Sequence, residues 1–149
     1  MIKTVWKYVS DNWENISLHD YDISEFVFGR DITLGFVDGF DVCKENPQNL
    51  SGRHKHTGNA AVILKNGAFL SAEYPSFEDN GKEIPAQSIE FSELSGLELE
   101  VFDHYFENGI FTLECTAWNS KGSFCKVNFT CEKPLFCWNE FTEDAWFWE

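Results

Sequence analysis

Apolar and polar residues alternate with a period of two along most of this chain, which is the pattern of strands with one buried face. No long segment shows the 3.6-residue period of an amphipathic helix. Short strands at close spacing predict an all-β fold, mainly antiparallel, as a two-sheet sandwich or an open barrel of roughly 8–10 strands. We expect the strands near residues 22–28, 31–37, 40–44, 60–65, 68–74, 97–107, 110–118, 123–131 and 135–141.

Turn residues separate these runs. Asp38-Gly39, Asn66-Gly67 and Asn108-Gly109 each lie between apolar stretches. Both central residues of a type I′ turn need positive φ, which Asn-Gly and Asp-Gly favour, so each pair predicts a hairpin. Residues 44–59 are read as a polar loop. Residues 75–87, with two prolines and an Asn-Gly pair of their own, are read as irregular.

Helix is expected in at most two short places. Trp6, Val9 and Trp13 stand at helix-like spacing near the start of the chain. Residues 90–98 allow a single helical turn, with Ser92 as its N-cap.

The segment GIFTLECTAWNSKGSFCKVNFTC, residues 109–131, has the most consistent strand pattern. Asn119 and Gly122 indicate a type I turn with a G1 bulge, and counting from that turn pairs Cys115 with Val127. A slip by one residue would reverse every side chain. One face then carries Phe111, Leu113, Cys115, Ala117, Cys125, Val127, Phe129 and Cys131. Counting from Asn108-Gly109 adds a third strand with the pairs Phe106–Phe111, His104–Leu113 and Phe102–Cys115.

This register bears on the five cysteines. Cys115 and Cys125 would be diagonal neighbours with Cβ atoms about 7–8 Å apart, whereas a disulfide needs about 3.5–4.5 Å. The C-x-x-C spacing of a zinc knuckle is missing. We interpret Cys115, Cys125 and Cys131 as buried thiols. The counting does not place Cys43 and Cys137.

The charge narrows the classes of partner. Eleven Lys and Arg face 25 Asp and Glu, a net charge of −14. Such a surface repels nucleic acid and anionic membranes. It favours encounter with a basic protein, although acidity can also serve solubility alone. Lys3 and Lys7 interrupt the only early apolar stretch, and no run reaches a membrane span. We therefore expect a cytoplasmic protein with one domain, residues 1–149.

The C-terminal run CWNEFTEDAWFWE combines aromatic and acidic side chains. A binding site for a basic peptide or protein would show this composition, since aromatic residues are enriched at interfaces. The same run could instead dock on the sheet. The residues assigned to this predicted tail surface are Trp138, Glu140, Phe141, Glu143, Asp144, Trp146 and Trp148.

Histidines supply the first candidate chemistry. His54 and His56, in the stretch RHKH, would project to one side of an extended segment and could take two positions on a metal ion. His-x-His also begins the metal motif of cupins, but the Glu expected shortly afterwards is missing. His19 or His104 would have to supply the third ligand. A solvated loop is the simpler interpretation.

Other candidate groups also have structural explanations. Asp103 and Glu114 should face each other, as in a glycosidase pair, with Lys126 near enough to relax them. His104 is expected to be a core histidine bonded to the backbone, and His19-Asp20 to lie in a turn. Since no nucleophile motif, phosphate loop or dinucleotide fingerprint occurs, we expect a non-catalytic protein with no cofactor and no metal.

Several stretches resemble a group of small uncharacterised bacterial proteins, which share an lhD…f.dGf…np.N…T..A run and a late WN…aW. They are SLHDYDI, ITLGFVDGFDV, ENPQN, TGNAAVIL, WNEF and DAW. These motifs are structural in character, so the resemblance implies no catalytic residue. Small acidic domains of this kind are also similar in type to immunity proteins that neutralise toxins.

The sequence therefore predicts a cytoplasmic binding protein with a basic protein as its partner, and the immunity type is one such protein. A barrel that holds a small molecule or sugar is the alternative. The third hypothesis is a hydrolase or metal-dependent enzyme that uses Asp103 and Glu114, or His54 and His56. The oligomeric state stays open.

Overall fold

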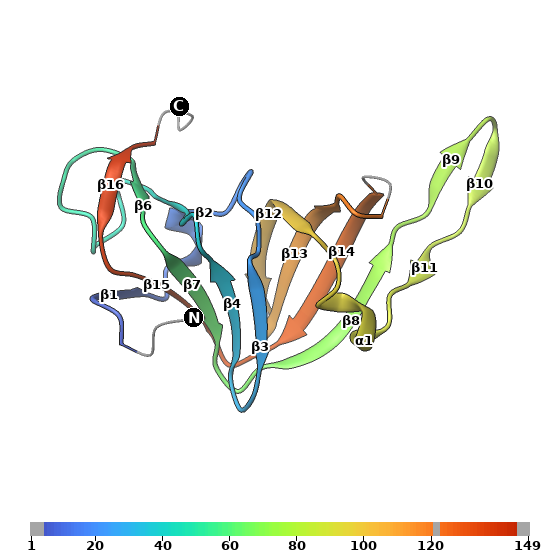
Figure 1. Ribbon diagram of the computed structural model, residues 1–149, viewed down its shortest axis with the longest axis horizontal. Helices are drawn as coiled ribbons and strands as arrows, with labels where there is room; N and C mark the ends of the chain where they lie inside the picture. The colour runs from blue at the N-terminus through green and yellow to red at the C-terminus, as the bar shows by residue number, and fades with distance from the viewer. Residues whose placement is uncertain (1–4, 121–122, 146–149) are drawn as a thin grey trace.

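The computed structural model describes residues 5–120 and 123–145 (Figure 1). Over these residues the chain forms four antiparallel sheets, none of which closes into a barrel. Helical structure in the described residues is confined to η1 (Trp13–Asn15) and α1 (Phe91–Leu94). The all-β prediction is confirmed, and the architecture is sandwich-like. The strands exceed the expected number because several have only two or three residues.

The first sheet has five strands in the order β1-β15-β7-β4-β3. They are β1 (Tyr8–Ser10), β15 (Pro134–Trp138), β7 (Ala60–Leu64), β4 (Ile32–Phe36) and β3 (Glu25–Phe28). β1 occupies a place where helix was predicted. That prediction is wrong because Tyr8, Val9 and Ser10 pair with β15, and this tertiary pairing overrides a local spacing.

The second sheet has five strands in the order β11-β8-β14-β13-β12. They are β11 (Gln87–Ser88), β8 (Ala68–Tyr74), β14 (Ser123–Thr130), β13 (Ile110–Ala117) and β12 (Leu99–Glu107). The three-stranded meander predicted from the sequence therefore exists.

The register of β13 on β14 differs from the prediction by two residues. Cys115 pairs with Cys125 instead of Val127, and Leu113 pairs with Val127. A shift of two keeps every side chain on its face, so the eight residues predicted to share one face are all buried. Between β12 and β13, the pairs His104–Leu113 and Phe106–Phe111 are as predicted. A bulge at Phe102 shifts the register beyond them, so Cys115 pairs with Val101 and not with Phe102.

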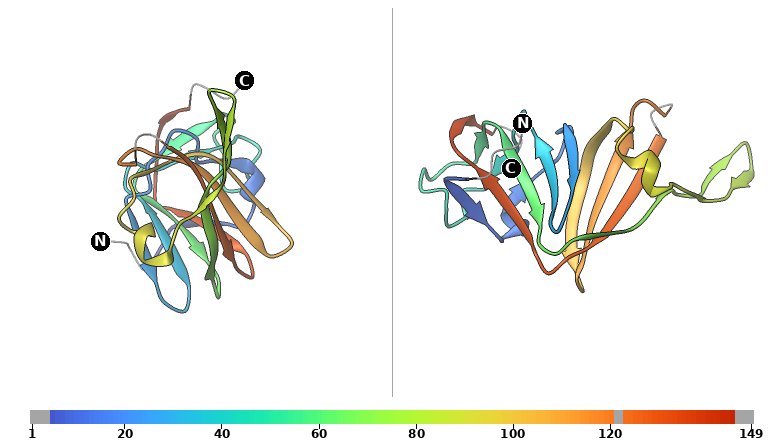
Figure 2. Two further views of the ribbon diagram at one scale, coloured as in Figure 1. Left: turned by 90° about the vertical axis from the view of Figure 1, so that its right-hand side faces the viewer. Right: turned by 60° about the horizontal axis from the view of Figure 1, so that its bottom comes forward.

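A third, four-stranded sheet and a hairpin complete the fold. The third sheet has the order β16-β6-β5-β2, with β16 (Phe141–Asp144), β6 (Lys55–Thr57), β5 (Asp41–Val42) and β2 (Ile16–Ser17). The hairpin joins β9 (Phe77–Asp79) to β10 (Lys82–Ile84) and projects away from the body in Figure 1 and in the right view of Figure 2.

The turn predictions had mixed outcomes. Asn108 and Gly109 both have positive φ and join β12 to β13 as a two-residue hairpin, as predicted. Asn80 and Gly81 do the same between β9 and β10, within the segment predicted to be irregular. The prolines of that segment lie outside the hairpin, at residues 75 and 85, and so do not interrupt its pairing.

Asp38-Gly39 and Asn66-Gly67 are not hairpins. In each pair only one residue has positive φ, Gly39 at 80° and Asn66 at 47°, so neither fits a type I′ turn. Both pairs instead carry the chain from one sheet to another, from β4 to β5 and from β7 to β8.

The cap of α1 also differs from the prediction. Glu90 is the N-cap, and its side chain forms a capping box with Glu93. Ser92 lies inside the helix.

The first and second sheets are joined at one corner. The paired strands β7 and β15 continue past Leu64 and Pro134 into the paired strands β8 and β14. The backbone N–H of Lys65 donates to Lys133 (3.1 Å), and that of Glu132 donates to the carbonyl of Lys65 (2.9 Å). In Figure 1 both sheets open from this corner.

The core lies where the inward faces of the three sheets meet. Rings from different sheets make contact there: the Phe111 and Phe136 centroids are 6.3 Å apart, and those of Phe26 and Phe129 are 6.5 Å apart. The largest fully buried side chains are Trp138, Phe36, Phe40, Phe111, Phe129 and Phe136. No helix in the described residues is long and apolar enough to cross a membrane.

The turn at Gly39 gives a stability prediction. An added Cβ there would lie 2.3 Å from the carbonyl oxygen of Thr57, on a residue with φ of 80°. We expect Gly39→Ala to lower the free energy of unfolding by about 2–5 kcal/mol, because backbone strain and overpacking add. Urea denaturation measures the change.

Gly52→Ala is the matched control for Gly39→Ala. Gly52 has a similar φ of 78°, but nothing lies within 4 Å of its added Cβ. It should cost only the left-handed strain, about 1–2 kcal/mol. Equal losses for the two variants would contradict the steric explanation.

Candidate functional site

The outward side of β8, β12, β13 and β14 forms a broad surface, here called the acidic face. These four strands contain five carboxylates, none of them buried, and Lys126 as their only Lys or Arg. Asp103 pairs with Glu114, Glu114 with Lys126, and Lys126 with Glu73. One row across the sheet thus holds three carboxylates and a single ammonium group.

Three large aromatic side chains are exposed beside this row. Phe102, Trp118 and Phe124 keep 55%, 58% and 45% of their surface accessible. The Phe102 and Phe124 rings meet edge to face with centroids 6.2 Å apart. Trp118 Nε1 donates a hydrogen bond of 2.8 Å to Glu100, which fixes the indole beside a carboxylate. The bulge in β12 is what turns Phe102 outward.

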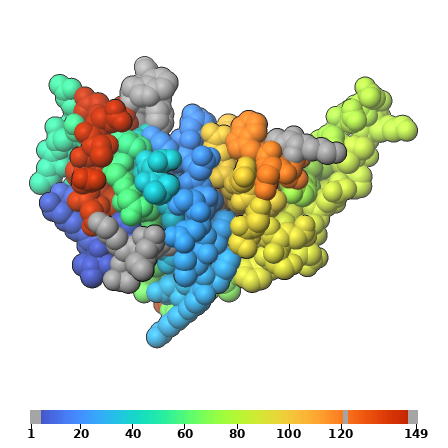
Figure 3. All heavy atoms as spheres, in the orientation of Figure 1, coloured from blue at the N-terminus to red at the C-terminus, as the bar shows by residue number. Residues whose placement is uncertain are grey.

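A pocket of about 470 Å³ lies at one end of the acidic face, where β8 leads into the projecting hairpin. Tyr74, Pro75, Ser76, Phe77, Ser123 and Phe124 line it. Phe77 is itself exposed, at the root of the hairpin. The hairpin stands clear of the body in the space-filling view (Figure 3) and carries Glu78, Asp79 and Glu83.

The two described aromatic residues of the predicted tail surface pack into the protein. Trp138 is fully buried, stacked on Tyr8 with centroids 5.5 Å apart, so it cannot contact a partner and does not belong to this surface. Phe141 is half-buried against the same two rings. The docking of this strand, which was the alternative, explains both aromatic residues.

The acidic residues of the tail lie at the surface. Glu140 and Glu143 are exposed. Asp144 pairs with Arg53 at 2.9 Å and with Lys55 at 2.8 Å, and these contacts hold the pKa of Asp144 below its usual range. Two cations thus balance part of the tail's charge. Trp146 and Trp148 lie outside the described residues.

Asp103 and Glu114 face each other across β12 and β13, as predicted. Asp103 accepts a hydrogen bond from the backbone N–H of His104 (2.8 Å) at the bulge. Glu114 has Lys126 as its other cross-strand neighbour. Asp103 borders a small cleft, and Glu114 is not among the residues that line it.

Two histidines have structural roles. His104 is buried and bonds through Nε2 to the carbonyl of Trp13 (3.0 Å), as expected of a core histidine; burial lowers its pKa. His19 lies in a turn, with Nδ1 2.8 Å from the carbonyl oxygen of Phe102 and Nε2 3.4 Å from Asp20. Neither belongs to the group of potential metal ligands that contains His54, so neither supplies the third ligand considered for His54 and His56.

His56 belongs to a buried polar cluster that links three segments. Its Nε2 donates to the carbonyl of Asp38 (2.7 Å), and its Nδ1 lies 2.9 Å from Asp41 Oδ1. Tyr21 donates its hydroxyl to the same oxygen at 2.8 Å. Asp41 is fully buried, and its Oδ2 has no hydrogen-bond partner in the described structure. Because both nitrogens of His56 are engaged, this cluster fastens β5 to β6.

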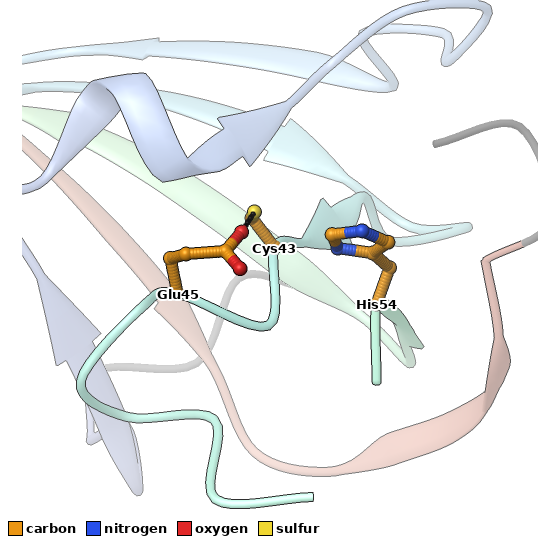
Figure 4. A group of neighbouring side chains, drawn as sticks. All are labelled: Cys43, Glu45 and His54. Atoms are coloured by element: carbon orange, nitrogen blue, oxygen red, sulfur yellow. Dashed lines mark hydrogen bonds between the residues drawn. The ribbon is translucent and has the colours of Figure 1, made fainter. Parts of the chain in front are cut away.

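His54 lies in a different group, with Cys43 and Glu45 (Figure 4). One potential ligand atom from each residue lies within 4.8 Å of the others. Among the described residues it is the one group of three His, Cys, Asp or Glu side chains this close. The pairing predicted for His54 was with other histidines, so this group was not predicted. Cys43 and Glu45 stand too far along the chain from His54 for any short motif.

All five cysteines are buried and free. Cys115, Cys125 and Cys131 are confirmed as buried thiols, although Cys115 and Cys125 pair directly across the strands instead of diagonally. A hydrogen bond between those two thiols, together with burial, raises the pKa of Cys115. Burial alone raises the pKa of Cys137 to about 12. These raised pKa values keep Cys115 and Cys137 in the thiol form at neutral pH.

Comparison with protein-family models, with curated proteins and with solved structures gave no match. The fold and the surface define an all-β, sandwich-like protein with one acidic, aromatic sheet face.

The buried cluster gives a prediction about pH. Burial raises the pKa of Asp41 in the folded protein, which therefore binds more protons than the unfolded chain between the two pKa values. The contribution of Asp41 to the free energy of unfolding should thus fall as pH rises through that range. Asn at position 41 cannot ionise but keeps an acceptor oxygen for Tyr21.

We therefore expect Asp41→Asn to gain stability relative to the wild type as pH rises over the range above about 4, the ordinary pKa of an Asp side chain. Urea denaturation of both proteins across this range measures the difference. A difference that does not change with pH, or that moves the other way, would mean that the pairing with His56 outweighs desolvation.

Proposed function

We propose that this protein is a non-catalytic binding protein that recognises a basic protein through the acidic face. The observation that carries the proposal is the composition of β8, β12, β13 and β14, with five carboxylates, one Lys and three exposed aromatic side chains on or beside them. Large exposed apolar groups within a charged surface are typical of interaction sites.

The charge supports a cationic partner. The chain carries a net charge of −14, and the acidic face has a local excess of four negative charges, from the five carboxylates and Lys126. Opposite potentials speed encounter and select against acidic partners. The aromatic residues would supply desolvated contacts, since truncation of a central aromatic anchor often costs more than about 2 kcal/mol.

The projecting hairpin supports a macromolecular partner. It continues the acidic face beyond the edge of the sheet, and the pocket at its root offers a recess for one side chain of the partner. The similarity in type to immunity proteins makes a toxin the kind of basic partner that we propose, and the cytoplasm the place of encounter.

The proposal can be tested by affinity capture from the cells that make the protein, at low and high salt. We expect a basic protein to be captured, less of it at high salt because screening weakens steering. Glu73→Gln with Glu114→Gln should reduce capture at low salt. Phe124→Ala should weaken binding about tenfold or more by isothermal titration.

Matched controls separate the acidic face from the tail. Glu140→Gln with Glu143→Gln removes the same charge from the tail, and Phe28→Ala removes an exposed ring elsewhere. Both should bind like the wild type. Capture that is insensitive to salt, or that only the tail variants abolish, would refute the proposal.

A second candidate function is the binding of a small apolar molecule or sugar in the pocket. Its aromatic lining, from Tyr74, Phe77 and Phe124, is the observation that favours it. A ligand library screened by thermal shift, with Phe77→Ala as control, distinguishes it: stabilisation that Phe77→Ala removes would favour this function.

A further inference from the structure

Cys43, Glu45 and His54 bring three different donor atoms together beside the ends of β5 and β6, the two central strands of the third sheet. Cys43 directly follows β5, Glu45 lies two residues later, and His54 directly precedes β6. The thiol donates to Glu45 Oε1 across 2.6 Å. In Figure 4 the carboxylate and the imidazole lie on either side of Cys43.

Hydrogen bonds from the buried side-chain amide of Asn49 and from the backbone N–H of Cys43 fix the backbone around these residues. The Asn49 side chain donates to the carbonyls of Val42 (3.1 Å), Cys43 (3.3 Å) and Arg53 (2.8 Å), so it ties the two ends of the loop together. The N–H of Cys43 donates to Asn15 (2.9 Å). Cys43 and His54 are therefore held near each other by interactions that do not involve their own side chains.

The loop also orients the imidazole. The backbone N–H of Lys44 donates to His54 Nδ1 at 3.0 Å, which turns that nitrogen toward the Cys43 side of the loop. Asn46, buried in the same loop, is anchored by a bond of 3.1 Å to Ser10. Preorganised ligands lower the entropic cost of binding an ion.

We propose that Cys43, Glu45 and His54 bind a zinc ion, with water as the fourth ligand. Thiolate, imidazole and carboxylate are the three protein donors that zinc uses, and four-coordinate geometry is its usual preference. A thiolate and a carboxylate neutralise the dication. On binding, the Cys43 thiol releases its proton to water, and His54 offers the lone pair of one ring nitrogen to the ion.

This site is independent of the acidic face, because its three residues lie on the third sheet and its loop. A zinc ion bound there would hold the two ends of the loop between β5 and β6 together. It also accounts for the exposed Glu45 beside a buried cysteine, a combination that packing alone does not need.

The test uses the full-length protein, purified in the presence of a chelator that is then removed. We expect zinc to bind with one equivalent per chain in competition with a chromophoric chelator. Cobalt in its place should give a thiolate-to-metal charge-transfer band and the intense visible bands of a tetrahedral site. Glu45→Gln, His54→Gln and Cys43→Ser should each weaken zinc binding at least tenfold.

Control variants are Glu132→Gln, His19→Gln and Cys131→Ser, which remove the same groups elsewhere. They should bind zinc like the wild type. Cys43→Ser alters a buried position, so the exposed Glu45→Gln and the half-buried His54→Gln decide the matter if it does not fold. Zinc affinity unchanged in both, or a cobalt spectrum without the thiolate band, would overturn the proposal.

Discussion

The fold depends on one corner, where two paired strands leave the first sheet together and enter the second. β7 pairs with β15 before the corner, and β8 pairs with β14 after it. Asp31 accepts bonds from Lys65 Nζ (2.9 Å) and the N–H of Asn66 (2.8 Å), and these bonds lower its pKa. Because both crossings are bonded to each other, neither sheet can shift without the other, and their inward faces stay opposed.

That opposition decides which side chains remain for function. With the inward faces of the first and second sheets committed to the core, strand alternation sends every second residue of β12, β13 and β14 outward. The bulge at Phe102 adds a third ring to that outward surface. The acidic face therefore results from the same alternation that builds the core. Its aromatic residues are exposed because their positions along the strands point their side chains outward.

The sequence predicts well what depends on alternation and poorly what depends on tertiary pairing. The buried face of residues 109–131 follows from period two and survives a register error of two, since parity alone assigns a face. Asn66-Gly67 resembles a hairpin turn in the sequence, because Asn and Gly are favoured both in turns within one sheet and in turns that connect two sheets. Trp138 looks like part of a surface, although Tyr8 covers it from the opposite end of the chain. The cluster of Cys43, Glu45 and His54 depends on the path of a loop, which no local pattern encodes.

The projecting hairpin has a consequence for how such a protein can diverge. Its turn is defined by Asn80 and Gly81 alone, and β9 and β10 pair only with each other in the described structure. Insertions, deletions or charge reversals there leave the interior untouched. The protein thus has a segment that can be remodelled while the body stays constant.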